Sequence, residues 1–97
     1  MLRHIVFFSA KNPQDIERIQ QLLMQLGTIP SVRHFEVSQN IRRDQFSSEV
    51  DLVVYGEFED EAALRAYKEH PIYAECIRQV KPLRDLRIAA DVRAEAS

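Results

Sequence analysis

LRHIVFFS, residues 2–9 at the start of the chain, decides the fold. The run is short, rich in β-branched and aromatic residues, and followed closely by Asn12-Pro13, so it predicts a strand rather than a helix. In a strand, successive side chains point to opposite faces. One face carries His4, Val6 and Phe8, and the other carries Ile5 and Phe7. We therefore expect both faces of this strand to be buried.

A helix is predicted directly after this strand. Asn12 can accept hydrogen bonds from free backbone N–H groups at a helix start, and Pro13 is tolerated at the first helical position. Gly27 and Pro30 indicate where the helix ends. Apolar side chains recur between these signals at three- and four-residue spacing, at Ile16, Ile19, Leu22, Leu23 and Leu26. This spacing gives the helix one apolar face.

Two more strands are predicted over residues 32–39 and 50–58, joined by a polar loop over residues 40–49. The first alternates apolar and polar residues, as a half-exposed strand near a sheet edge does. Its apolar face carries Phe35 and Val37, opposite His34 and Glu36. The second has apolar residues on both faces, and Gly56 within it predicts a bulge or a close approach.

A broken helix precedes the last predicted strand. Asp60 is a plausible N-cap for its first part. Pro71 cannot lie inside a straight helix, so a second helical segment is predicted to begin there and to end before Pro82. The apolar stripe of this segment is Tyr73, Cys76, Ile77 and Val80. The final strand is predicted over residues 83–92, with Leu86 and Ile88 buried and a frayed tail from Arg93.

The predicted order is strand, helix, strand, strand, broken helix, strand. This is the βαββαβ plan of a ferredoxin-like α+β sandwich with a four-stranded antiparallel sheet. Right-handed crossovers place both helices on one face of that sheet. The apolar residues on the other face then need a partner, because such a face usually marks an interface or a ligand groove. The simplest closed arrangement is a two-fold homodimer packed sheet against sheet, a dimeric α+β barrel.

Length and composition narrow the class of protein further. The 97 residues predict one domain over residues 1–97, and 45% hydrophobic with 29% charged residues is typical of a globular protein. A net charge of −2 argues against nucleic acid and acidic membranes as partners, since both attract clustered Lys and Arg. The single cysteine, Cys76, excludes an internal disulfide framework. Together with a start that lacks the pattern of a signal peptide, it predicts a cytoplasmic protein.

Five segments carry a family likeness: RHIVFF at residues 3–8, IPSV at 29–32, FEDEAALRAY at 58–67, His70-Pro71 and Ala90-Asp91. In their order and spacing they resemble the stress-responsive A/B barrel family, called Dabb. The resemblance spans nearly the whole chain. It implies a ferredoxin-like protomer that forms a dimeric barrel, with a pocket in each protomer between sheet and helices. Most members look like proteins of unassigned function, while a few, such as a plant polyketide cyclase, are enzymes without a cofactor.

Those cyclases use a His-Pro-x-His motif, whose second histidine acts as general base near a tyrosine. His70-Pro71 matches the first half of the motif, Tyr67 matches the tyrosine, and His4 matches a pocket histidine on the first strand. Tyr73 stands where the motif has its second histidine. A phenol with a pKa near ~10 is a poor base at neutral pH, whereas an imidazole near ~6.5 is well suited. The cyclase mechanism therefore does not transfer intact.

Each candidate residue also has a structural interpretation. His4 is the best remaining base, but a buried, hydrogen-bonded histidine would look the same. His70 can cap a helix, and Tyr67 and Tyr73 can be core residues. We expect His34 on the surface and Cys76 as a small core residue. Three dispersed histidines without ligand spacing predict no metal site, and no cofactor is expected.

Three functions remain open. The first is a homodimer that binds a small apolar or aromatic molecule in a pocket lined by His4, Val6, Ile19, Leu22, Val54, Tyr67 and Tyr73. The alternative is a cofactor-independent enzyme of the cyclase or isomerase kind, in which His4 is the base and Tyr67 or Tyr73 polarises a carbonyl. The third is a non-catalytic, stress-related protein whose side chains fill the pocket. A pocket smaller than a small aromatic ring would count against the first two.

Overall fold

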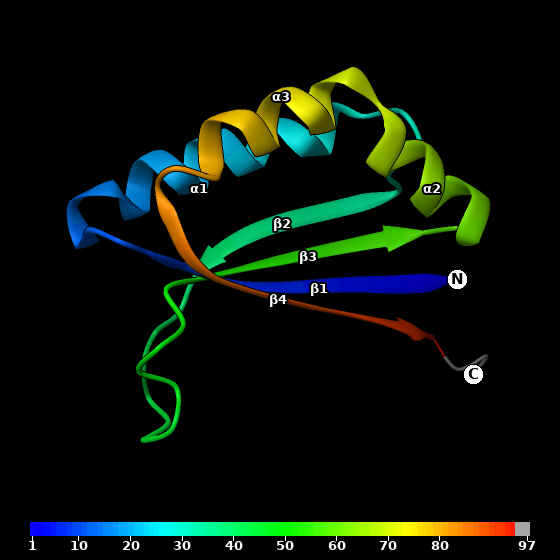
Figure 1. Ribbon diagram of the computed structural model, residues 1–97. Helices are drawn as coiled ribbons and strands as arrows, with labels where there is room; N and C mark the ends of the chain where they lie inside the picture. Colours follow the sequence, from blue (N-terminus) through cyan, green and yellow to red (C-terminus); the bar gives the residue numbers. More distant parts are fainter. Residues whose placement is uncertain (95–97) are drawn as a thin grey trace.

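The computed structural model describes residues 1–94 and has two layers, a four-stranded antiparallel sheet and a set of helices on one of its faces (Figure 1). In chain order the elements are β1 (Leu2–Ala10), a 3-10 turn (Pro13–Asp15), α1 (Ile16–Met24), a second 3-10 turn (Gln25–Thr28), β2 (His34–Gln39), β3 (Leu52–Phe58), α2 (Glu61–Glu69), α3 (Pro71–Val80) and β4 (Arg84–Arg93). The strand order β2-β3-β1-β4 confirms the predicted ferredoxin-like plan.

The face of the sheet under the helices forms the core. The even-numbered side chains of β1 point to this face, and Val6 lies opposite Val54 of β3. Helix side chains such as Ile19 and Leu23 pack onto it and are almost fully buried. Because β1 and β3 are the two central strands, their alternation fixes which residues enter the core.

The other face, which we call the open face, has no helix over it (Figure 1). Its apolar side chains come from β1, β3 and β4. Phe7 pairs with Ile88, and these two side chains are 40% and 56% exposed. The prediction that Ile88 is buried is therefore wrong for the single chain, while Leu86 is partly buried. Strand β4 also runs through Arg93, where a frayed tail was expected, and the rest of that tail beyond residue 94 lies outside the described residues.

The helix ends follow the predicted signals with one exception. Asn12 accepts a hydrogen bond from the backbone N–H of Gln14, and Asp60 accepts one from that of Ala63. Gly27 does not end the first helix as predicted: α1 ends at Met24, and Gly27 lies inside the 3-10 turn that follows. A 3-10 turn tightens the last turn of a helix and satisfies its free carbonyls, so no left-handed glycine is needed.

Gly56 marks a close approach and not a bulge, because the pairing of β1 with β3 is continuous through it. A Cβ atom at this position would lie 3.1 Å from the ring of Phe58.

None of the helices in residues 1–94 has the length and apolar character needed to cross a bilayer.

Candidate functional site

The most unusual group in the core is His4. Its side chain is 1% exposed, and its Nδ1 lies 2.5 Å from a carboxylate oxygen of Asp91 on β4. The two residues are direct partners in the register of β1 and β4, so the backbone places them together. A carboxylate can only accept a hydrogen bond, which means that Nδ1 carries the proton and donates it to Asp91.

The charge state of His4 follows from this environment. Burial lowers the pKa of His4 below its ordinary value of 6.5, and the hydrogen bond and charge of Asp91 oppose that shift. The neutral imidazole with its proton on Nδ1 leaves Nε2 as a free acceptor. Within residues 1–94, Nε2 makes no hydrogen bond to a protein atom. His4 therefore has the tautomer and orientation of a general base.

Aromatic rings surround His4 on the helix side. The ring of Tyr67 lies 5.9 Å from His4 and 5.1 Å from Tyr73, in edge-to-face contacts. Burial raises the pKa of Tyr67 well above its ordinary value, so its hydroxyl stays protonated and can donate. Within residues 1–94 the only buried side-chain nitrogen or oxygen without a hydrogen-bond partner is Ser31 Oγ, so the two tyrosine hydroxyls are not buried unpaired groups. The polar side chains of His4, Tyr67 and Tyr73 are thus brought together by ring contacts in one part of the core.

These groups line one small cavity between the sheet and the helices. Its walls are His4, Val6, Phe8, Leu23, Leu26, Val54, Tyr67, Tyr73, Ile77 and Arg87. The cavity measures about 10 Å³, roughly what a single water molecule requires. A cavity that encloses a benzene ring is about 150 Å³, so an aromatic ligand cannot lie inside this one as it stands.

The cavity can be compared with the predicted pocket. His4, Val6, Val54, Tyr67 and Tyr73 line it, as the sequence predicts. Ile19 and Leu22 do not line it, although both are buried in the core. Whether any of these residues binds a ligand stays a prediction.

Sequence reasoning missed two polar residues of the site, Asp91 as the partner of His4 and Arg87 as a wall of the cavity. Both lie on the helix side of β4, and the guanidinium of Arg87 forms no ion pair within residues 1–94. The period-two pattern of β4 contains the signal, because Arg87, Ala89 and Asp91 alternate with Leu86 and Ile88. Ala89 is exposed and the Asp91 side chain is 38% exposed, so the helices leave this side of β4 uncovered.

A wider groove adjoins the site along the same strand. It measures about 450 Å³ and is lined by residues of α2 and β4, including Leu64, Lys68, Asp91 and Arg93. Asp91 thus contacts His4 on one side and faces this groove on the other. A molecule in the groove would lie beside the His4–Asp91 pair.

The remaining candidates have structural roles. His70 accepts a hydrogen bond from the backbone N–H of Ile72 through Nδ1 and caps α3. Cys76 is buried, its thiol donates to the carbonyl of Leu22, and burial raises its pKa to about 11, which opposes a role as nucleophile. His34 is on the surface beside Glu36. No group of three or more His, Cys, Asp or Glu side chains in residues 1–94 is arranged to hold a metal ion.

The family follows from a model that matches residues 2–94, the Stress responsive A/B Barrel Domain, abbreviated Dabb. The chain belongs to the Dabb family. Its ferredoxin-like sheet and helix layer agree with this membership, and so does the sequence resemblance noted above. No curated protein matches the chain.

Several solved structures have the same fold as this Dabb chain. A Dabb family protein with a ferredoxin-like fold from Mesorhizobium loti is 24% identical with a TM-score of 0.82, over 98% of this chain and 97% of that one. A dimeric ferredoxin-like protein of unknown function from Thermobifida fusca is 22% identical with a TM-score of 0.81, over 96% of this chain and 90% of that one. An antibiotic biosynthesis monooxygenase is 17% identical with a TM-score of 0.76, over 99% of this chain and all of that one. At these identities the similarity shows the fold alone.

Proposed function

We propose that this Dabb protein is a cytoplasmic homodimer that binds a small molecule at the His4 cavity. The observation that carries the proposal is the meeting of the His4 imidazole with the rings of Tyr67 and Tyr73 around one small cavity, where Nε2 of His4 makes no hydrogen bond to a protein atom of residues 1–94. An imidazole nitrogen and two phenols beside one cavity can hydrogen-bond a polar atom of a small molecule, which supports the proposal.

The size of the cavity determines what part of the ligand enters it. About 10 Å³ admits one polar group, such as a carbonyl or hydroxyl oxygen, and no ring. The apolar or aromatic body of the ligand would then lie outside the cavity, against the uncovered side of β4 beside Arg87. The phenols would donate to the oxygen, and the charge of Arg87 would favour electron density there.

The alternative of a purely structural protein predicts side chains that fill the pocket completely. The cavity of about 10 Å³ is smaller than a small aromatic ring, so by the size criterion stated above it counts against the first two functions and favours this alternative. The two functions separate through Tyr67→Phe. If the hydroxyl only packs, its removal changes nothing that involves ligands. If it binds a ligand, its removal weakens binding roughly two- to tenfold, the effect of one lost hydrogen bond.

Acetophenone and ethylbenzene are suitable probes, because they share a shape and differ in the carbonyl oxygen. We expect acetophenone to shift the NMR signals of residues that line the cavity, ethylbenzene to act more weakly, and Tyr67→Phe to reduce the difference. Equal binding of both probes, or no shift at the cavity, would contradict the proposal. Native mass spectrometry of gently purified protein would report any ligand that co-purifies.

A second candidate is a proton-transfer enzyme, and the His4–Asp91 pair favours it. Nε2 of His4 would remove a proton from the carbon next to a carbonyl, and the electron pair of that C–H bond would move to the oxygen to form an enolate. Tyr67 or Tyr73 would donate a hydrogen bond to the enolate, and return of the proton to another carbon gives an isomer.

Exchange of the methyl hydrogens of acetophenone in D₂O tests this step. His4→Gln should abolish it, His34→Gln should not, and a wild-type rate equal to the buffer rate would exclude it for this probe.

The dimer is proposed to form through the open face. Phe7, Ile88 and Val92 expose apolar surface there, and related structures include dimeric proteins. Phe7→Asp should place a charge in this interface and give a monomer of about 11 kDa in light scattering, whereas Met24→Asp on the helix side should leave the dimer intact. If the Phe7→Asp variant is still a dimer, the interface does not lie on the open face.

A further inference from the structure

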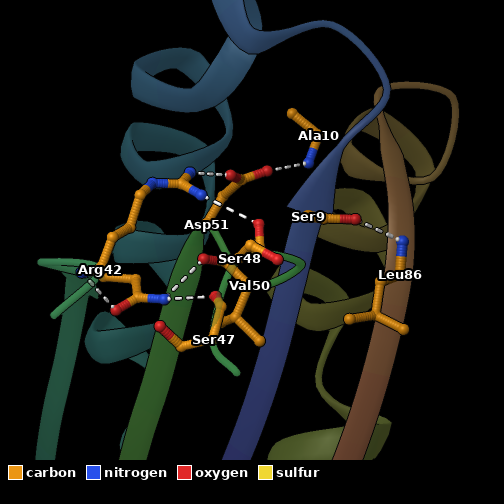
Figure 2. A network of polar contacts seen from close by, with 9 residues as sticks. Ser9, Ala10, Arg42, Ser47, Ser48, Val50, Asp51 and Leu86 are labelled. Atoms are coloured by element: carbon orange, nitrogen blue, oxygen red, sulfur yellow. Dashed lines mark hydrogen bonds and ion pairs between the residues drawn. The ribbon is translucent and has the colours of Figure 1, made fainter. Parts of the chain in front are cut away.

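The loop between β2 and β3, residues 40–51, contains a second polar network (Figure 2). Asn40 donates from its side-chain amide to the carbonyls of Ser47 and Val50, at 2.9 and 2.8 Å. Arg42 donates to the carbonyl of Ser48 and pairs with Asp51. The loop is therefore closed on itself by side chains that hold its two sides together.

The same network fixes the loop to the sheet. The carboxylate of Asp51 accepts a hydrogen bond from the backbone N–H of Ala10, at 2.8 Å, and its own N–H donates to the carbonyl of Phe8. Arg42 has a φ of 57°, a conformation that costs a non-glycine residue free energy. The chain thus orders this loop with five or more polar contacts and one strained residue, and a free connecting loop needs neither.

The loop exposes two large apolar side chains, Ile41 next to its base and Phe46 near its tip. Phe46 is 86% exposed and Ile41 is 79% exposed, the highest values among the large apolar side chains of the described residues. The loop extends away from the helix layer and past the plane of the open face (Figure 1). Any molecule that covers the open face therefore lies beside this loop.

We propose that residues 40–51 form an arm that packs on a second copy of this chain, with Phe46 and Ile41 as its contacts. The inference rests on the proposed dimer through the open face. A two-fold axis through that face sends the arm of each protomer along the sheet of the other, so each dimer has two arm contacts. The partner is a second copy because the arm and the apolar residues of the open face lie on the same side of the molecule.

Phe46→Ser and Met24→Ser form a matched pair for the test. Both remove an exposed apolar side chain, but Met24 lies at the end of α1 in the helix layer. Phe46→Ser should raise the dimer dissociation constant about tenfold or more in a dilution series by analytical ultracentrifugation, since an apolar anchor is lost twice per dimer. Met24→Ser should change it less than about twofold. Asn40→Ala, which loosens the arm without shortening it, should give an intermediate value.

Dimers of one spin-labelled chain and one isotope-labelled wild-type chain test whether the arm contacts the partner directly. A spin label on Ser48→Cys, in a Cys76→Ala background, should broaden amide signals of an isotope-labelled wild-type partner near its open face. Suppose that the wild-type chain is a dimer, that Phe46→Ser has the same dissociation constant, and that the label broadens no partner signal. These results would contradict the arm contact but not the proposed dimer. A wild-type chain that stays monomeric at all concentrations overturns both.

Discussion

The two faces of the sheet carry apolar side chains from the same strand, yet their situations differ completely. On β1, Phe8 points to the helices and is 3% exposed, while its neighbour Phe7 points to the open face and is 40% exposed. The covered face is completed by the chain itself, through α1, α2 and α3. The open face has no helix over it, and the proposed dimer would cover it. Alternation in a strand thus separates a face for folding from a face that the proposed dimer would use for association.

The largest effect on the free energy of unfolding is expected from alanine substitutions at Phe7 and Phe8, adjacent residues that point to opposite faces of the sheet. Phe8→Ala should lower the free energy of unfolding by about 3–5 kcal/mol, since it leaves a cavity in the core. Phe7→Ala should have little effect on the isolated chain, but its cost should grow with protein concentration, because a dimer stabilises the folded state by mass action. Urea unfolding at two protein concentrations measures both. If the loss in free energy of unfolding depended on protein concentration for Phe8→Ala but not for Phe7→Ala, the assignment of these side chains to the two faces would be wrong.

A smaller effect tests how tightly the covered face is packed. Gly56→Ala would place a Cβ atom 3.1 Å from the ring of Phe58, which is 0% exposed and held 4.9 Å from Tyr67. Overpacking typically destabilises the folded state by about 1–3 kcal/mol. Replacing Gly with Ala also lowers the conformational entropy of the unfolded chain, which stabilises the protein by about 0.4–1 kcal/mol. We expect a net loss of about 1 kcal/mol in thermal or urea unfolding. Stabilisation by Gly56→Ala would show that Phe58 can move aside.

Much of this comparison could be predicted from local sequence. Alternation in β1 and β3 separates the two faces, and Asp60, His70 and Pro71 mark the helix boundaries. Strand β4 shows the limit of such reasoning. Its period-two pattern groups Leu86 with Ile88, but which group faces the helices depends on the pairing with β1, more than 70 residues earlier in the chain.

The candidate site was harder to predict for the same reason. His4 was placed on the correct face by its own strand. Its partner Asp91 and the neighbouring Arg87 follow only from the β1–β4 register. Ile19 and Leu22 were expected at the pocket because they lie on the apolar face of α1, but a helix face about 100° wide does not say which of its residues meets a given cavity.

The His4–Asp91 pair adds a pH dependence that only the covered face should show. Because burial lowers the pKa of His4 in the folded chain, the unfolded chain binds a proton first as the pH falls below 6.5. The free energy of unfolding should therefore decrease from pH 6.5 downward and level off, in this contribution, below the lowered pKa. Lys68 and Arg87 lower this pKa further, and Asp91 opposes them.

His4→Gln should remove this part of the pH profile in urea unfolding, and His34→Gln, which changes an exposed histidine on the open face, should keep it. The opposite sign is also informative. If the wild-type chain became more stable as the pH fell below 6.5, the charge of Asp91 would outweigh burial, and His4 would be an imidazolium ion in the folded chain. A protonated His4 cannot accept a proton through Nε2, so that result would remove the proton-transfer candidate at such a pH and leave the cavity as a site for binding alone.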